Sequence, residues 1–331
     1  MDIESLEVGE LVSGVFLVAD AKPGVDRRGQ NYYSLVLNAE KGRSIEAKVW
    51  ADNIGAKLGP GMGVEIMARV DQYQGNVQLN VQRYKVLPAG EFDPSPYVRT
   101  ATVDVNAAFE TLFNWGREEF RDPCLKAVML EFYRNEAFAR EFKLSPAASF
   151  HHHNYQGGLA EHTLEVWQVA QRLHEQFQGP LNLELLLASA ALHDVGKVRC
   201  YTLTAGVSQP SDLGQLLDHI FISASMVSNV WDRVVTREVA GGDPDGAACT
   251  KALLLHVVLS HHGRREWGAP VIAQIPEAVL LHYCDQVSAA MRACFDAFDS
   301  RTPGEAWTGK VYLMDTPRRL YVPPTVRATQ E

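Results

Sequence analysis

The chain has 331 residues, of which 46% are hydrophobic and 21% charged, as in a folded globular protein with room for two domains. Its formal net charge of −9 argues against a broad basic surface for duplex binding, although a local groove for nucleic acid stays allowed. The five cysteines are scattered without CxxC spacing and the N-terminus lacks an apolar signal segment, so we expect reduced thiols in a cytoplasmic protein. No apolar stretch reaches the ~20 residues that span a bilayer, which predicts no membrane contact.

Residues 8–86 contain five short segments rich in β-branched and aromatic residues. Turn-forming stretches such as "AKPGVDRRGQ", "EKGR" and "LGPGMG" separate them. Five strands in about 80 residues predict a small closed barrel, for which the OB-fold is the common nucleic-acid-binding type and an SH3-like barrel is the alternative. We therefore predict an OB-like, five-stranded β-barrel over residues 1–88.

Alternation along the third and fifth strands predicts which side chains leave the barrel core. Lys48, Trp50 and Tyr84 are expected on the outer face, together with the amide side chains of the fifth strand. An outer face of this kind is typical of a stacking platform for single-stranded nucleic acid. The alternative is that the aromatic side chains shield a barrel rim or pack on a second domain. The residues expected inside are Ile45, Ala47, Val49, Val77, Leu79 and Val81.

The pattern changes after the barrel. Residues 87–103 hold three prolines and neither a strand nor a helix period, so we predict a linker over residues 89–103. Apolar residues then recur at helical spacing throughout residues 104–300, which predicts an all-α domain. Residues 301–331 have a mixed character and are expected to pack back on one of the domains.

Three polar residues lie on the apolar faces of predicted helices. His162 shares its face with Leu159 and Val166, and His219 and Asp285 lie on similar apolar stripes. A single inward histidine is more often a satisfied core residue than a ligand. An inward aspartate is harder to explain, because a buried carboxylate needs a cation, a proton or hydrogen-bond donors.

Two further pairs, His193–Asp194 and His261–His262, each end a predicted helix shortly before a glycine. The backbone can turn at such a point, so that both members of a pair reach one ion. Imidazole and carboxylate together suit Mn, Fe, Zn or Ni better than Ca or a thiolate-preferring ion. The joint order H…HD…H…HH…D is far more specific than any one residue, and it predicts a metal site.

This order resembles the HD superfamily of metal-dependent phosphohydrolases, whose domains are all-helical. The stretches "HHHNYQGGLAEHT", "LHDVGK", "LLDHI", "SHHGRREWGAP" and "PEAVLLHYCDQVSAAM" after a barrel resemble, more narrowly, the YhaM-type 3′-to-5′ exoribonucleases, which join an OB-fold to an HD domain. The resemblance covers nearly the whole chain and is strongest over residues 150–292. It departs at Asp218, where that family often carries glycine.

The resemblance implies a ligand set. His162, His193, Asp194 and Asp285 would hold one ion, and His219 with one or both of His261 and His262 would complete a second site that Asp194 bridges. Mn²⁺ is the expected ion, with Fe, Co, Ni or Mg as alternatives, and either one or two ions are allowed. A bacterial, cytoplasmic enzyme acting on single-stranded RNA, and on single-stranded DNA as an open alternative, would then release 5′-mononucleotides from the 3′ end.

Residues beside the ligands are candidates for catalysis. His193 and Asp194 form the expected catalytic centre, because a metal ion that they hold lowers the pKa of water. Lys197 is expected to offset the charge that develops on the phosphorane, with a solvated helix-end lysine as the alternative.

Other residues near the ligands are candidates for substrate contact. Arg264 and Arg265 are expected to bind substrate phosphates, with plain solvation as the alternative. His152, His153 and Glu161 precede the first ligand and are expected to orient it or to contact substrate.

Two other functions compete with the exonuclease interpretation. One is a nucleotide or cyclic-dinucleotide phosphohydrolase in which the barrel regulates or oligomerises, and the other is an RNA-binding protein with a vestigial metal site. The complete ligand set counts against the vestigial site. The aromatic and amide face of the barrel favours an exonuclease over a small-nucleotide hydrolase, and the oligomeric state stays open.

Overall fold

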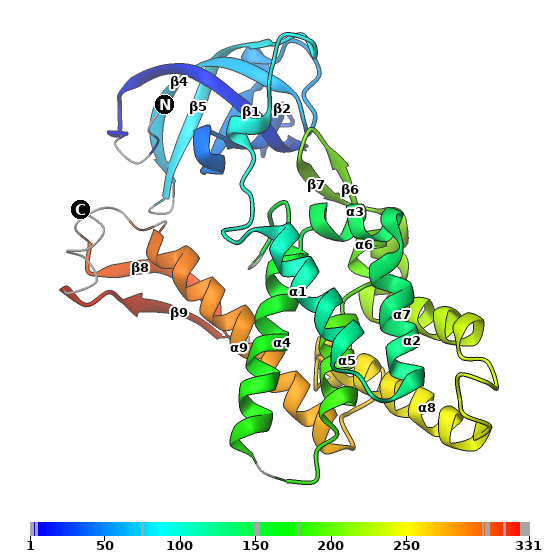
Figure 1. Ribbon diagram of the computed structural model, residues 1–331. Helices are drawn as coiled ribbons and strands as arrows, with labels where there is room; N and C mark the ends of the chain where they lie inside the picture. The colour runs from blue at the N-terminus through cyan, green and yellow to red at the C-terminus, as the bar shows by residue number, and fades with distance from the viewer. Residues whose placement is uncertain are drawn as a thin grey trace. The chain divides into compact units, whose positions relative to one another are not determined.

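The computed structural model describes residues 3, 6–73, 76–148, 153–177, 179–299, 301, 305–313 and 316–324. It divides the chain into two compact units (Figure 1). The barrel unit comprises the described parts of Met1–Thr100 and Leu203–Gln209, and the helical unit comprises those of Ala101–Thr202 and Pro210–Glu331. Among the described helices, none combines the length and the apolar character needed to cross a membrane.

The barrel unit is built from five strands that close on themselves in the order β1-β2-β3-β5-β4. Neighbouring strands are antiparallel except for the parallel pair β3–β5. This is the five-stranded OB-like barrel that the sequence predicts. The strands are β1 (Leu11–Val25), β2 (Asn31–Asn38), β3 (Ser44–Trp50), β4 (Gly63–Tyr73) and β5 (Asn76–Val86).

The residues that the alternation predicts inside the barrel are buried, with one exception. Ile45, Ala47 and Val49 of β3 are buried, as are Leu79 and Val81 of β5. Val77 is 38% exposed instead, so its predicted place inside is wrong. Val77 precedes the stretch of β5, Gln78–Val81, that pairs with β3. It therefore has a neighbouring strand, β4, on one side only.

Tyr84 also differs from the prediction, because a β-bulge interrupts β5. Ile66 of β4 pairs with Tyr84, whereas Ala68 pairs with Val81, so β5 has one extra residue between these pairs. The extra residue reverses the alternation. Ile66 points into the core, and its partner Tyr84 packs against the same core instead of facing outward.

The first predicted turn is shorter than expected. β1 continues to Val25 and forms a hairpin with β2, so the stretch that we assigned to a loop is half strand. Beyond Leu17, β1 pairs with β2 and no longer with β4, so Pro23 lies on an edge where a missing N–H is tolerated. The turn itself closes with Asp26, whose carboxylate accepts hydrogen bonds from the backbone N–H groups of Arg28 and Gln30.

A second hairpin, β6 (Tyr201–Thr204) with β7 (Val207–Pro210), supplies residues Leu203–Gln209 to the barrel unit. Gln209 donates a hydrogen bond from Nε2 to the carbonyl of Ala19 at 3.0 Å. Gly206 has a φ of 78°, and an added Cβ there would lie 2.5 Å from Val98. Tight packing thus holds the hairpin within the barrel unit, although its residues fall inside the range predicted to be all-α.

The helical unit begins most of its helices with a polar N-cap, as the physics of unpaired N–H groups requires. The capping side chains that accept backbone N–H groups are Asp104, Asp122, Asn135, Asn182, Ser211 and Asp243. The helices are α1 (Val105–Glu118), α2 (Pro123–Arg134), α3 (Glu136–Leu144), α4 (Gly158–Gln176), α5 (Leu183–Leu192), α6 (Lys197–Cys200), α7 (Asp212–Val234), α8 (Pro244–Ser260) and α9 (Pro276–Asp299).

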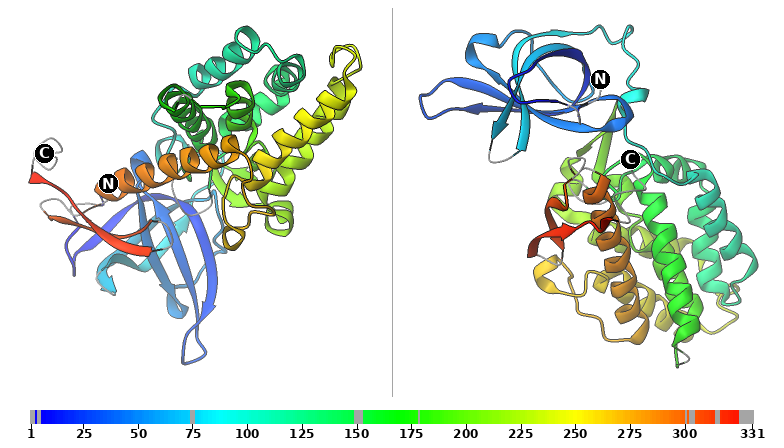
Figure 2. Two further views of the ribbon diagram at one scale, coloured as in Figure 1. Left: turned by 90° about the horizontal axis from the view of Figure 1, so that it is seen from below. Right: turned by 90° about the vertical axis from the view of Figure 1, so that its left-hand side faces the viewer.

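Helix α5 is the centre of this unit. Every residue from Leu185 to Leu192 is buried, and the helix packs on α2, α4, α8 and α9. Burying a leucine side chain contributes about 1.5–3 kcal/mol to the free energy of unfolding, compared with leaving it exposed. The buried leucines of this short helix therefore stabilise its packing against the four neighbouring helices. Figures 1 and 2 show α4 and α9 side by side, with the β8 (Trp307–Leu313) and β9 (Thr316–Tyr321) hairpin against α9.

Candidate metal centre

The predicted ligands converge on one place in the helical unit. His162 lies on α4, His219 on α7 and Asp285 on α9, whereas His193 and His261 are the C-cap residues of α5 and α8. Three overlapping groups have ligand atoms within 4.8 Å of one another. These groups are His162 with His193 and Asp285, His193 with Asp194 and His261, and His219 with His261 and His262.

The turn after α5 explains how an adjacent histidine and aspartate both reach the centre. α5 ends at Leu192, and the chain turns before α6 begins at Lys197. Gly196 allows that turn to approach α7 closely, because an added Cβ would lie 2.5 Å from the Ser223 nitrogen and 2.6 Å from the His219 carbonyl. Its N–H also donates to the Ser223 hydroxyl at 2.8 Å. The glycine in "HDVGK" therefore brings Asp194 next to the helix that carries His219.

Asp194 lies between two sets of imidazoles and presents one oxygen to each. Its Oδ2 is 3.2 Å from Nε2 of His193 and 3.5 Å from Nε2 of His162. Its Oδ1 is 3.5 Å from Nε2 of His219 and 3.7 Å from Nε2 of His261. This carboxylate has the geometry of a bridging ligand between two ion positions.

Each of the five histidines has its Nδ1 atom within hydrogen-bond distance of a group behind it, which leaves Nε2 toward the centre. Fixing one ring nitrogen sets the tautomer and the orientation of a metal-binding imidazole. The partners are Ser288 Oγ for His162 at 3.0 Å, Ala190 O for His193 at 2.8 Å, Asp218 Oδ1 for His219 at 2.5 Å, Val258 O for His261 at 2.7 Å and Trp267 O for His262 at 2.6 Å.

Two atoms at the centre have no hydrogen-bond partner among the described residues, and both are buried. They are Oδ1 of Asp194 and Nε2 of His219. Buried polar atoms of this kind are rare in folded proteins unless an ion or a water satisfies them. A divalent cation fits this donor set of imidazole nitrogens and carboxylate oxygens.

Electrostatics in the buried cluster are dominated by the carboxylates. Burial alone would raise the pKa of Asp194, but Lys197 and His193 hold it well below its usual value. Burial alone would lower the pKa of His162, but the hydrogen bonds that it donates to Asp194 and Asp285 raise it to about 9. Burial and the neighbouring His262 instead hold the pKa of His261 well below its usual value. His261 is therefore neutral at physiological pH, as a metal ligand would have to be, whereas an ion would have to displace a proton from His162.

Lys197 is aimed at the centre. Its Nζ is 2.6 Å from Oδ2 of Asp194, and its side chain is only 13% exposed. Burial would lower the pKa of Lys197, but the Asp194 charge raises it, so the side chain stays a cation. This placement is compatible with the catalytic role predicted for Lys197 and excludes a fully solvated lysine.

Behind His162 lies a buried polar network that the sequence analysis missed in part. Ser288 Oγ donates to Glu165 at 2.7 Å, and Arg292 bridges Glu165 and Glu161 at 2.7 and 2.8 Å. Glu165 and Arg292 support His162 through Ser288. Asp285, Ser288 and Arg292 share one face of α9 at spacings of three and four residues, a signal that could have revealed the network.

His153 belongs to this supporting network. None of its surface is exposed, its Nε2 lies 3.2 Å from Glu165, and its ring centre lies 5.3 Å from that of His162. Its burial beside His162 and Glu165 favours the first of the two predicted roles, which is to orient the first ligand. Glu161 is equally buried and accepts a hydrogen bond from the Tyr155 hydroxyl at 2.7 Å. His152, the other residue predicted here, lies outside the described residues.

Arg264 and Arg265 follow the second histidine pair and are exposed. The Arg264 guanidinium stacks over the Trp267 ring at 4.7 Å from its centre. The same Trp267 residue accepts the Nδ1 hydrogen of His262 through its carbonyl. The two arginines thus extend outward from the loop that positions a ligand.

The barrel unit has its own aromatic cluster. Tyr32 of β2 pairs with Trp50 of β3, and their ring centres are 5.4 Å apart. Lys48 lies over the Tyr32 ring at 4.9 Å and donates to Ser34 at 2.8 Å. Lys48 and Trp50 therefore share the outer face, as predicted, and Tyr32, which the sequence analysis missed, completes it. The register between β2 and β3 places Tyr32 opposite Trp50, and the sequence alone does not give that register.

Tyr84 does not join that cluster. Its hydroxyl accepts the N–H of Gly55 at 2.8 Å and donates to the carbonyl of Ala56 at 2.5 Å. Its ring packs on the barrel core, so the predicted outward orientation of Tyr84 is wrong, and its hydroxyl ties the 55–56 loop to β5.

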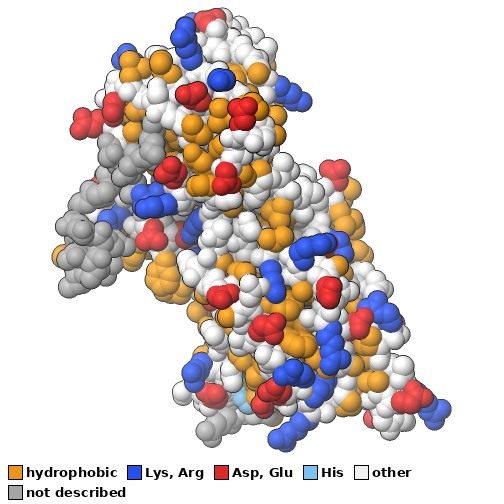
Figure 3. Space-filling view, turned by 45° about the horizontal axis from the view of Figure 1, so that its top comes forward, with side chains coloured by type: hydrophobic (Ala, Val, Ile, Leu, Met, Phe, Trp, Pro, Cys, Tyr) orange, Lys and Arg blue, Asp and Glu red, His pale blue; other side chains and the backbone are white. Residues whose placement is uncertain are grey.

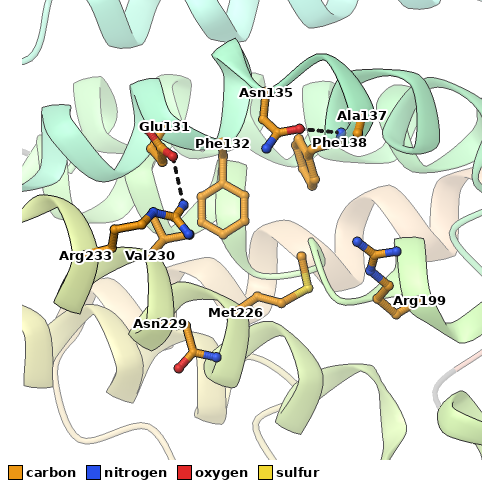
Figure 4. A pocket seen from close by; sticks show the side chains of 10 residues that line it. All are labelled: Glu131, Phe132, Asn135, Ala137, Phe138, Arg199, Met226, Asn229, Val230 and Arg233. Atoms are coloured by element: carbon orange, nitrogen blue, oxygen red, sulfur yellow. Dashed lines mark hydrogen bonds and ion pairs between the residues drawn. The ribbon is translucent and has the colours of Figure 1, made fainter.

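A pocket of about 280 Å³ lies elsewhere in the helical unit, and none of the predicted ligands lines it (Figure 4). Phe132 and Phe138 form an apolar part of its wall. The two arginines at this pocket are paired, Arg233 with Glu131 at 2.8 Å and Arg199 with Glu141 at 3.4 Å. On the face shown in Figure 3, basic and acidic side chains are likewise interspersed.

Comparisons with known proteins place the chain. A family model described as "HD domain" matches residues 159–290, which include all seven predicted ligands. The 3′-5′ exoribonuclease YhaM of Bacillus velezensis is 30% identical over 325 residues, covering 96% of each chain. The protein of that name from Bacillus subtilis is 28% identical over 324 residues, again covering 96% of each. Among solved structures, a domain of replication protein A from Methanococcus maripaludis has a TM-score of 0.24 and 18% identity, covering 26% of this chain and 93% of that one. The near-complete coverage at 30% identity means that this chain belongs to the family of the 3′-5′ exoribonuclease YhaM.

Proposed function

We propose that this protein is a metal-dependent exoribonuclease of the cytoplasm that shortens single-stranded RNA from the 3′ end and releases 5′-mononucleotides. Single-stranded DNA is a secondary substrate in this proposal. The observation that carries it is the position of Asp194, whose two carboxylate oxygens face two separate sets of imidazoles. The relatives named as 3′-5′ exoribonucleases, which match 96% of the chain, support the same conclusion.

The residues present fit two divalent ions. A bound divalent ion lowers the pKa of a water nucleophile and stabilises negative charge on a phosphate, and Mn²⁺ is the ion that we propose. The first ion position would be held by His162, His193, Asp194 and Asp285, and the second by Asp194, His219, His261 and His262.

The chain's own residues supply positive charge and alignment. Lys197 holds a cation beside Asp194, where it can neutralise charge on the non-bridging oxygens of the scissile phosphate. Arg264 and Arg265 can bind the next phosphates of the strand. Water attacks the last internucleotide phosphorus, the bond from phosphorus to the 3′ oxygen breaks, and that oxygen takes up a proton. The phosphate then stays on the 5′ carbon of the released nucleotide.

The barrel is proposed to hold the strand. Tyr32 and Trp50 offer ring faces on which bases stack, and Lys48 supplies a charge for the backbone. Stacking of this kind tolerates any base, which suits an enzyme that removes nucleotides in succession.

The test uses a 5′-labelled, unstructured RNA of 20–30 nucleotides with purified full-length protein, Mn²⁺ and an EDTA control. We expect a ladder that shortens from the 3′ end and vanishes with EDTA, and nucleoside 5′-monophosphates by mass spectrometry. An identical DNA strand measures the preference for RNA. Intact RNA together with rapid hydrolysis of free nucleotides or cyclic dinucleotides would replace this proposal with the small-nucleotide phosphohydrolase.

A further inference from the structure

Asp218 adopts a backbone conformation that a residue with a side chain rarely takes. Its φ is 60° and its ψ is 155°, in the middle of α7. This region of conformational space is occupied essentially by glycine, and other residues persist there only when their surroundings hold them. The strain at Asp218 therefore needs a compensating interaction.

The carboxylate of Asp218 makes that interaction with the next residue. Its Oδ1 accepts the backbone N–H of His219 and the Nδ1 hydrogen of the His219 ring, both at 2.5 Å. The ring is thereby held with Nε2 toward Asp194, 3.5 Å from its Oδ1.

His219 differs in this respect from the other ligands. His193 and His261 use the carbonyl three residues earlier in their own helices, and His262 uses the Trp267 carbonyl. The kink at Asp218 interrupts α7 immediately before His219, and the carboxylate of the kinked residue takes the place of a carbonyl. A carboxylate behind an imidazole orients the ring and strengthens its second nitrogen as a metal ligand.

Asp218 also lies near the loop that follows His262. A Cβ added at Gly268 would be 3.7 Å from Asp218 Oδ2, and Gly268 comes directly after Trp267. The Asp218 side chain thus lies between His219 and the segment that positions His262. His219 and His262 belong to one ligand group.

We infer that Asp218 is a positioning residue, which holds His219 as a ligand of the second ion position at the expense of backbone strain. The inference rests on the proposed function only in requiring that this position binds a divalent ion. It assigns Asp218 no contact with substrate. Replacing Asp218 should therefore improve the stability of the metal-free chain while weakening one ion position and sparing the other.

The experiment compares the full chain with Asp218→Gly and Asp218→Asn. Urea unfolding in EDTA reports the strain, and calorimetric titration with Mn²⁺ reports the two ion affinities. We expect Asp218→Gly to raise the urea midpoint and to weaken one Mn²⁺ affinity roughly 10–100-fold, with the other changed less than about twofold. Asp218→Asn keeps the strained side chain and an acceptor oxygen, so its midpoint should match the parent and its affinity should fall less.

A matched control is Asp212→Gly, because Asp212 is an exposed aspartate in a regular turn of the same helix. Glycine there should lower the urea midpoint and leave both Mn²⁺ affinities unchanged. The ¹⁵N spectrum of the metal-free His219 ring gives an independent reading: the Nδ1–H form in the parent and a mixture of tautomers in Asp218→Gly.

The outcomes separate the role of Asp218 from the proposed metal-dependent function. Suppose that the parent binds two Mn²⁺ ions. If Asp218→Gly binds both ions as tightly as the parent, Asp218 is not a positioning residue. The same holds if the substitution lowers both Mn²⁺ affinities alike and also lowers the urea midpoint. If the parent binds no Mn²⁺, the proposed metal-dependent function fails first and the inference fails with it.

Discussion

The Nδ1 atom of His162 lies 3.0 Å from the Ser288 hydroxyl oxygen, and that hydroxyl donates its one hydrogen to Glu165. Since Ser288 has no second hydrogen to give, His162 must be the donor in the first of these bonds. The Nε2 atom that faces Asp194 and Asp285 is then the atom left for an ion. Three residues on two helices thus decide which nitrogen of a ligand is available.

Ser288→Ala should weaken Mn²⁺ binding about 10–100-fold and destabilise the chain by about 1–3 kcal/mol, because His162 and Glu165 lose a buried partner. Titration calorimetry and urea unfolding measure the two effects. Ser189→Ala is the matched control, since the buried Ser189 hydroxyl has no hydrogen-bond partner within the described part of the chain. Equal behaviour of the two variants would contradict the role given to Ser288.

Asp194→Asn should abolish RNA hydrolysis and lower the free energy of unfolding by about 3–5 kcal/mol, because Lys197 loses the charge with which it is paired. The double variant Asp194→Asn with Lys197→Met should regain most of that stability and none of the activity. Urea unfolding in EDTA and the labelled-RNA assay separate the effects. Activity in either variant would refute the assignment of Asp194 as the bridging ligand.

Trp50→Ala should weaken binding of a long single strand by about 1–3 kcal/mol, the contribution of one stacked base, with little effect on hydrolysis of a dinucleotide. Fluorescence anisotropy with labelled RNA measures the first quantity, and product release from the dinucleotide the second. Tyr84→Phe is the control, because Tyr84 faces the core and its hydroxyl only ties the 55–56 loop. If Tyr84→Phe lowered the RNA affinity and Trp50→Ala left it unchanged, the assignment of Trp50 to the RNA-binding face would be wrong.

Ion binding should release a proton from His162. The pKa of His162 is about 9 in the folded chain, against an ordinary value of 6.5, so the residue is protonated at pH 7.5 and an ion must displace that proton. Calorimetry in two buffers with different ionisation enthalpies should detect the release, and His162→Asn should lose it.

The same shift predicts how the stability of the metal-free chain depends on pH. Because the folded pKa of His162 is the higher one, its contribution is complete below pH 6.5 and is lost as the pH rises through about 9. Urea midpoints in EDTA should fall across that window, and less so in His162→Asn. A rise across the same window in the parent would show that the sign is wrong.

Gly196→Ala should destabilise the chain by about 1–3 kcal/mol and weaken the His219 position, because the new Cβ would meet the backbone of α7 at 2.5–2.6 Å. Gly309→Ala is the matched control in the same unit, where an added Cβ meets nothing within 4 Å. Urea midpoints and Mn²⁺ titrations of the two variants make the comparison. A Gly196→Ala chain as stable as Gly309→Ala would mean that the turn has room to shift.

The fold and the convergence of the candidate ligands could be predicted from the sequence because both depend on periodicity. Helical spacing placed His162, His219 and Asp285 on inner faces, and alternation placed Ala47 and Val49 in the barrel core. Both signals are local, and each recurs over many residues. The order of the ligands along the chain then added the information that no one helix contains.

The parts that could not be predicted depend on single residues or on tertiary pairing. One extra residue in β5 turned Tyr84 inward, and only the register with β4 reveals it. Glu165 looks like a solvated charge on a helix surface until α4 and α9 are seen to pack together. The strain at Asp218 has no periodic signature, because an aspartate within a helical pattern reads as an ordinary exposed residue.

The β6–β7 hairpin has a consequence for synthesis on the ribosome. The chain passes from the barrel unit to the helical unit after Thr100, returns after Thr202 and leaves again after Gln209. About a hundred residues separate the five strands from the hairpin, which takes roughly 5–20 s to elongate, and during that time the nascent barrel unit lacks its hairpin segment. His193 and Asp194 are translated within that interval. A gene fragment that stops at codon 100 therefore encodes the five strands without the hairpin segment of the barrel unit, and that unit is completed only after the turn with His193 and Asp194 has been made.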